Sequence, residues 1–130
     1  MVLGKRTLTK GTIEGMGMST QIDSQAAAVT AVSYTASGAI GAADNVVDLD
    51  TASGAMAMTI AIPEPGRILV ITQIDSGTDG HTVTLTSGTF DGTNNTATFN
   101  AQYEALVLLG ISDKRFLILK NYGSVALSDV

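Results

Sequence analysis

The most reactive side chains of this sequence gather around its one histidine, His81, which follows a turn carrying Asp75, Ser76 and Asp79. A serine hydrolase needs a hydroxyl, an imidazole and a carboxylate that converge from separate parts of the chain. Here the three residue types lie along one short loop, and that spacing does not predict a catalytic triad. We therefore expect His81 to be a surface histidine at a turn.

Aspartates near the ends of expected strands are the second possible source of chemistry: Asp44, Asp48, Asp50, Asp75, Asp79 and Asp91. Calcium takes six to eight oxygen ligands, often from closely spaced aspartates, but no stretch has the spacing of an EF-hand loop. Asx-turns that cap the loops are the expected role. A glycosidase would place two carboxylates in an aromatic-lined cleft, whereas this chain has no Trp, three Tyr and three Phe.

Other classes of function are disfavoured by composition. The absence of cysteine excludes thiolate nucleophiles, disulfides and cysteine zinc sites, and no phosphate-binding glycine motif is present. The net charge of −5 disfavours nucleic acid as a partner. No apolar run approaches the length of about 18 residues that spans a bilayer, and Met1–Lys10 lacks the apolar segment of a signal peptide. We expect no enzymatic activity, no cofactor and no membrane partner.

Short segments of alternating apolar and polar residues position these side chains and predict an all-β protein. The expected strands are Ala27–Tyr34, Asn45–Asp50, Ala55–Ile62, Arg67–Ile74, His81–Thr86, Thr96–Asn100, Glu104–Leu109 and Lys114–Lys120. Turn residues at 63–66, 76–80 and 91–92 favour hairpins. We therefore expect an antiparallel β-sandwich or barrel, jelly-roll-like. A parallel β-helical fibre would give the same alternation and is the alternative.

Two of these segments are apolar on both faces, at Ile68–Ile71 and Leu106–Leu109, which is typical of central strands or of subunit contacts. Charged residues make up only 15% of the chain and hydrophobic residues 45%, so part of the surface is expected to be covered by other subunits. In Ala55–Ile62 the bulky side chains share one face. The residues predicted for the core or for subunit contact are Met56, Met58, Leu106 and Leu108.

The expected domains are an extended N-terminal arm at residues 1–26 and a β-sandwich at residues 27–130. Three of the seven basic residues, Lys5, Arg6 and Lys10, lie in the first ten positions. The arm is too polar and glycine-rich to form a core face by itself. Our hypothesis is that neighbouring subunits or a larger surface hold it, and the alternative is an edge strand of its own sheet.

Residues 45–119 resemble a β-module that recurs in virion structural proteins of tailed bacteriophages. The resemblance rests on a strand ending in Val-Asp-Leu-Asp, an apolar strand closing on Pro, and Pro-Gly-Arg before the next strand. An Asp-Ser-Gly turn, a Val-Thr-Leu strand, an Asp-Gly turn and a Tyr before an apolar strand complete it. Such modules often carry Trp where this chain has Phe116, and fibre versions usually belong to longer chains, so the length favours a small capsid decoration, or cement, protein.

The resemblance implies a homotrimer on the outer capsid surface of the virion, where it binds the major capsid protein and stabilises the head. It implies a capsid-binding arm carrying Lys5, Arg6, Leu8 and Lys10. An alternative is a phage head or tail fibre module or another carbohydrate-binding β-domain, with loops Asp75–Gly80 and Asp91–Asn95 binding glycan or calcium. An enzyme of unrecognised type is the third hypothesis.

Overall fold

A computed structural model describes residues 30–130, which contain ten β-strands and no helix. Within this range there is accordingly no helix long and apolar enough to cross a membrane. The predicted arm at residues 1–26, with Lys5, Arg6, Leu8 and Lys10, lies outside the described residues. Ala31–Val130 form one compact unit.

The strands are β1 Val32–Tyr34, β2 Gly38–Ala39, β3 Val46–Leu49, β4 Ala57–Ile60, β5 Ile68–Gln73, β6 His81–Leu85, β7 Thr96–Phe99, β8 Ala105–Ile111, β9 Arg115–Tyr122 and β10 Ala126–Ser128. Each of the eight expected strands has a counterpart, with bounds that differ by a few residues, and residues 27–29 of the first expected strand lie outside the described range. Two strands, β2 and β10, were not expected, because they are very short and lack an alternating apolar pattern.

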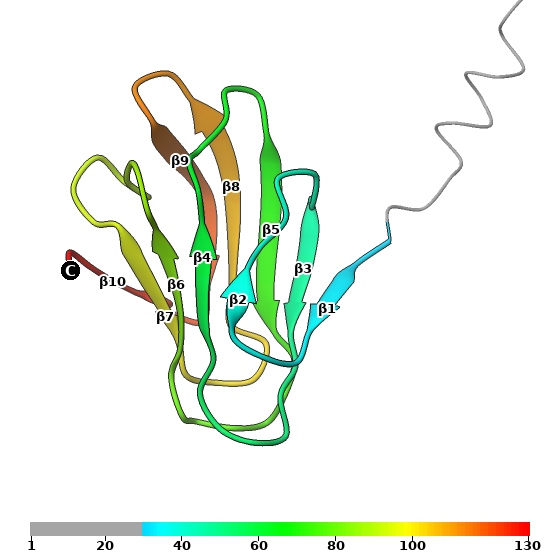
Figure 1. Ribbon diagram of the computed structural model, residues 1–130. Coiled ribbons are helices and arrows are strands. Elements are labelled where there is room, and N and C mark those ends of the chain that lie inside the picture. Colours follow the sequence, from blue (N-terminus) through cyan, green and yellow to red (C-terminus); the bar gives the residue numbers. More distant parts are fainter. Residues whose placement is uncertain (1–29) are drawn as a thin grey trace, which may run out of the picture. The chain divides into compact units, whose positions relative to one another are not determined.

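Two five-stranded sheets face each other as the layers of a sandwich (Figure 1). One sheet has the order β1-β3-β5-β8-β9 and the other the order β10-β7-β6-β4-β2. The prediction of an all-β sandwich is therefore confirmed. The expected central strands of the first sheet are also confirmed, since β5 lies at its centre and β8 beside it.

Both sheets are mixed, because the chain alternates between them from β1 to β6. As a result of this alternation, β1, β3 and β5 pair in parallel in one sheet, and β2, β4 and β6 pair in parallel in the other. From β6 onward the pairings are antiparallel. The first six strands thus follow the winding of the parallel alternative, and the last four complete an antiparallel sandwich.

The hairpins predicted at residues 63–66 and 76–80 are wrong. These loops join β4 to β5 and β5 to β6, and in both cases the chain crosses from one sheet to the other. Turn residues specify a reversal of chain direction, which an arch between sheets and a hairpin within one sheet have in common. Hairpins do occur between β6 and β7 and between β8 and β9.

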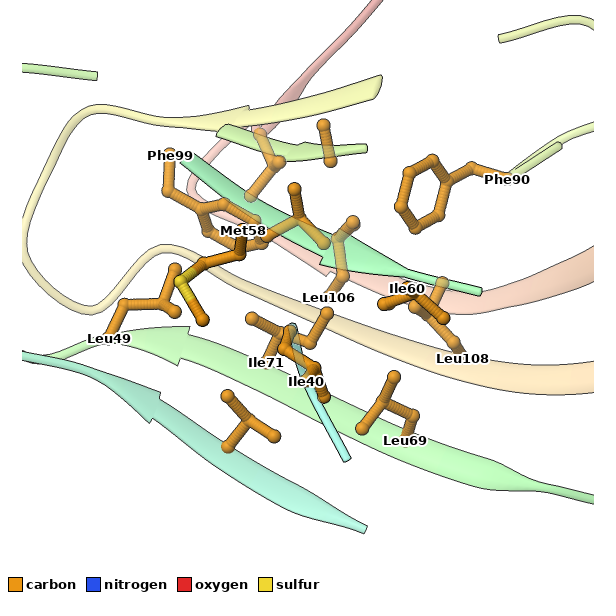
Figure 2. Close-up of a cluster of buried hydrophobic side chains, with 14 of the residues drawn as sticks. Ile40, Leu49, Met58, Ile60, Leu69, Ile71, Phe90, Phe99, Leu106 and Leu108 are labelled. Atoms are coloured by element: carbon orange, nitrogen blue, oxygen red, sulfur yellow. The ribbon is translucent and has the colours of Figure 1, made fainter. Parts of the chain in front are cut away.

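Alternating side chains from both sheets fill the space between the layers (Figure 2). Met56, Met58, Leu106 and Leu108 are all buried there, and complete burial of such a side chain contributes roughly 1.5–3 kcal/mol. Of the two predicted roles, the structure therefore supports the core, and burial inside a single chain leaves these four side chains unable to make subunit contacts. The apolar residues that face outward alternate with these buried residues along the strands of the first sheet.

Candidate functional site

The two sheets present very different outer surfaces. The sheet that contains β4, β6 and β7 carries threonines at its outward positions, which we call the threonine face: Thr59, Thr82, Thr84, Thr98 and the buried Thr96. The hydroxyl oxygens of Thr84 and Thr96 lie 3.0 Å apart across neighbouring strands. Threonine on the solvent side of a sandwich is the expected pattern, because β-branched polar residues suit a half-solvated strand.

The other sheet has an apolar outer surface, which we call the apolar face: Val46, Ile68, Val70, Val107, Leu109 and Leu117. In one row across three strands, Ile68 pairs with Leu109 and Leu109 with Leu117. Ile68 is 52% exposed and Leu117 43%. A contiguous apolar patch on a folded chain marks an interaction surface, so this face is the candidate functional site.

A second row continues the apolar face toward the first edge of the sheet. Val46 of β3 pairs with Val70 of β5, which pairs with Val107 of β8. All three valines are half-buried. Together the two rows make a surface of branched side chains on rigid, hydrogen-bonded strands, which suits the close packing of a protein interface.

Edge strand β9 gives this face a basic border. Lys120 extends the valine row, and its ammonium lies 5.4 Å from the centre of the Tyr122 ring, in cation–π contact. Leu119, which occupies a bulge opposite Val107 and Leu108, is half exposed. Of the four basic residues in the described part of the chain, only Arg67 lies away from β9 and the turn before it.

His81 is buried, so the prediction of a surface histidine is wrong. Its Nδ1 accepts a hydrogen bond from the Met56 N–H at 3.0 Å, which leaves the proton on Nε2. Nε2 lies 2.7 Å from Oδ2 of Asp75 and donates to it. The imidazole therefore ties the β5–β6 loop to the start of β4, and both of its nitrogens are occupied by this structural role.

Opposing effects set the pKa of Asp75. Burial is the largest and raises the pKa, but hydrogen bonds from His81 and from the backbone N–H groups of Gly77 and Thr51, with attraction to His81, outweigh it. The net result is a pKa below the ordinary aspartate value. Asp75 also lines an open polar pocket of about 420 Å³ with Asp50 and Asp79. Across residues 30–130, no group of three or more His, Cys, Asp or Glu side chains is arranged to hold a metal ion.

The loops Asp75–Gly80 and Asp91–Asn95 do not form the predicted binding cluster. They precede and follow β6, so they lie at opposite ends of the sandwich (Figure 1). The Asx-turns expected of aspartates are confirmed in both loops. Oδ1 of Asp75 accepts from the Gly77 N–H at 2.8 Å, and Oδ1 of Asp91 accepts from the Thr93 N–H at 3.0 Å.

Part of the apolar face could be predicted from the sequence. The runs Ile68–Ile71 and Leu106–Leu109 carry apolar residues at successive positions, which one buried face alone does not require. The contribution of β9 was missed, because Leu117 and Leu119 were interpreted only as strand residues. Comparisons with protein-family models, with curated proteins and with solved structures returned no match.

Proposed function

We propose that this protein is a virion structural protein, a capsid decoration or cement protein that binds the outer capsid surface and stabilises the head as a homotrimer. The observation that carries the proposal is the apolar face, with Ile68, Leu109 and Leu117 in one row. Its resemblance to phage virion modules over residues 45–119 supplies the biological context. The protein acts by binding and not by catalysis.

The occupant of the apolar face is a second copy of the chain. Interfaces within homo-oligomers are more apolar than those between transient partners, and the outward residues of β3, β5 and β8 include few charges. The N-terminal residues are the proposed contact with the major capsid protein, since the resemblance assigns a capsid-binding role to Lys5, Arg6, Leu8 and Lys10. Binding in many copies stabilises the assembled capsid by mass action.

Self-association is tested by measuring the mass of the full chain in solution by light scattering and native mass spectrometry. We expect a trimer, and we expect Ile68→Lys/Leu117→Lys to be monomeric because it buries two charges in the interface. Thr82→Lys/Thr98→Lys is the matched control, with two lysines on the threonine face, and should remain trimeric. A monomeric parent chain, or a trimer that persists in the first variant, would contradict the assignment of the interface.

Capsid binding needs a separate test on virions from the source that encodes the chain. We expect its peptides in purified heads by mass spectrometry, and extra density on the outer capsid surface by electron cryomicroscopy. If the purified heads lack the protein, the proposal fails. Density only in a fibre would instead favour the fibre-module hypothesis, which the parallel winding of β1 to β6 makes the second candidate.

A further inference from the structure

We propose that the turn between β8 and β9 is a binding site for carboxylate groups of an acidic protein partner, held by Lys114 and Arg115. The turn borders an open pocket of about 440 Å³, lined mainly by the 88–92 loop and by Ile111–Arg115. It lies at the end of the sandwich opposite the loop that carries Asp75 (Figure 1). This inference does not depend on the proposed function.

The backbone of the turn is strained at two successive non-glycine residues, one of which is Lys114. The loop between the paired residues Ile111 and Arg115 has three residues. Two of them are in the left-handed region, Asp113 with φ 66° and Lys114 with φ 55°. Such positions favour glycine, which adopts positive φ without steric cost. Strain of this kind in a non-glycine residue is concentrated at functional sites. The lysine side chain is therefore the feature to explain.

The turn is also fixed in place. The Thr89 N–H donates to the Lys114 carbonyl at 3.0 Å, and the Phe116 N–H donates to the Thr89 carbonyl at 3.0 Å. Gly88 lies so close that a Cβ there would overlap the Lys114 carbonyl oxygen. Because the backbone is held against a second loop, a ligand at this position does not need to order it, which lowers the entropic cost of binding.

Arg115 is held beside Lys114, and the Asp91 carboxylate attracts it without forming an ion pair within 4.0 Å. Its guanidinium lies over Gly92, where an added Cβ would stand 3.1 Å from Cζ and 3.2 Å from Nη1. Among residues 30–130 the ion pair within 4.0 Å is that of His81 and Asp75, so Lys114 and Arg115 have no carboxylate partner there. A planar guanidinium binds a carboxylate through two parallel hydrogen bonds, and a neighbouring ammonium adds a third.

The surrounding charge selects the class of partner. Acidic residues outnumber basic ones in the chain, with a net charge of −5, and Asp113 lies in the same turn. A dense polyanion such as nucleic acid would bring many phosphates against this acidic body. One or two glutamate or aspartate side chains on a protein surface would contact the turn alone. An acidic protein segment is therefore the ligand that fits.

The experiment is a titration of the ¹⁵N-labelled full chain with a blocked triglutamate peptide at low salt, followed by NMR. We expect shifts confined to the amides of the 88–92 loop and of Ser112–Arg115. Lys114→Gly/Arg115→Gln should weaken binding at least about fivefold, the effect of losing two exposed ion pairs. Lys120→Gln, a cation on the same strand outside the pocket, is the control and should bind like the parent.

Three results would overturn the inference. They are shifts spread over the whole chain, unchanged affinity in the double variant, or tighter binding of inorganic phosphate or oligothymidylate than of the peptide. Because glycine relieves the strain at position 114, Lys114→Gly alone is expected to melt at a higher temperature than the parent. Weaker binding by a more stable variant could not be explained by misfolding.

Discussion

The backbone of Gly110 in β8 lies directly against the carbonyl of Glu64, so that a Cβ on Gly110 would overlap the Glu64 oxygen. Two hydrogen bonds fix this approach. The Gly66 N–H donates to the Gly110 carbonyl at 2.8 Å, and the Gly110 N–H donates to the Arg67 carbonyl at 2.7 Å. The arch between β4 and β5 is thereby attached to the end of β8.

Replacing Gly110 by alanine should therefore be strongly destabilising. The new methyl group meets backbone, which cannot rotate away as a side chain can, so we expect Gly110→Ala to lower the free energy of unfolding by about 2–4 kcal/mol. Urea denaturation followed by circular dichroism measures the change. Gly38→Ala is the matched control, since nothing lies within 4 Å of a Cβ at that position. Equal stability of the two variants would contradict the close approach.

The buried imidazole gives a second prediction. His81→Ala leaves the Met56 N–H without its acceptor and opens a cavity, so we expect a loss of about 3 kcal/mol in the free energy of unfolding. Thr82→Ala, the next residue on the outward side of β6, should change it by less than about 0.5 kcal/mol. Equilibrium urea curves test both. A loss at His81 no larger than at Thr82 would mean that the Met56 and Asp75 contacts contribute little.

Stability should fall in acid because two aspartates have lowered pKa values. For Asp91 the largest cause is the hydrogen bond from the Asn94 N–H, and for Asp75 the hydrogen bonds from His81 and the backbone outweigh burial. A pKa lowered by folding contributes stability that is complete above the unfolded value of about 3.9 and is lost as pH falls through the folded value.

Urea midpoints of the parent chain and of Asp91→Asn, measured from pH 6 to pH 2, test this dependence. The parent should lose stability progressively below about pH 4. The variant should start lower and show a shallower decline, because asparagine has no carboxyl proton that folding could release. Parallel curves for the two proteins would show that Asp91 has the same pKa in the folded and unfolded chains.

Relief of backbone strain is the fourth prediction. Lys114→Gly should raise the free energy of unfolding by about 1 kcal/mol, because φ 55° carries no steric cost for glycine. Calorimetry measures the corresponding rise in melting temperature. Lys114→Ala keeps the strained backbone while removing the charge, so it should gain nothing. If alanine stabilised the protein as much as glycine, the effect would come from charge and not from φ.

The strands were predictable from sequence because alternation survives in nearly every one of them, as in His81–Leu85 and Ala57–Ile60. The connection of strands was not, because Pro63–Gly66 and Ser76–Gly80 have the same turn chemistry whether the next strand pairs in the same sheet or crosses to the other. That choice depends on packing between distant strands, which local composition does not encode.

The candidate site was predictable only in part. Doubly apolar runs at β5 and β8 indicated a covered surface, but the residues chosen for contact, among them Leu106 and Leu108, lie on the inward side of the strand. Successive side chains of a strand point to opposite faces, so a shift of one residue along the strand moves the predicted contact from the outer to the inner face. Burial of His81 was not predicted, because its partners Asp75 and Met56 lie on a loop and on a segment 25 residues earlier, and no local pattern joins them.

The alternation of β1 to β6 between the two sheets has a consequence for how the protein unfolds. Each successive strand belongs to the opposite layer, so neither layer is a continuous piece of chain that could persist while the other melts. We expect a single cooperative unfolding transition, in which spectroscopic probes of the threonine face and of the apolar face give the same midpoint. Proteolysis of the native chain would correspondingly yield no stable fragment made of one layer alone.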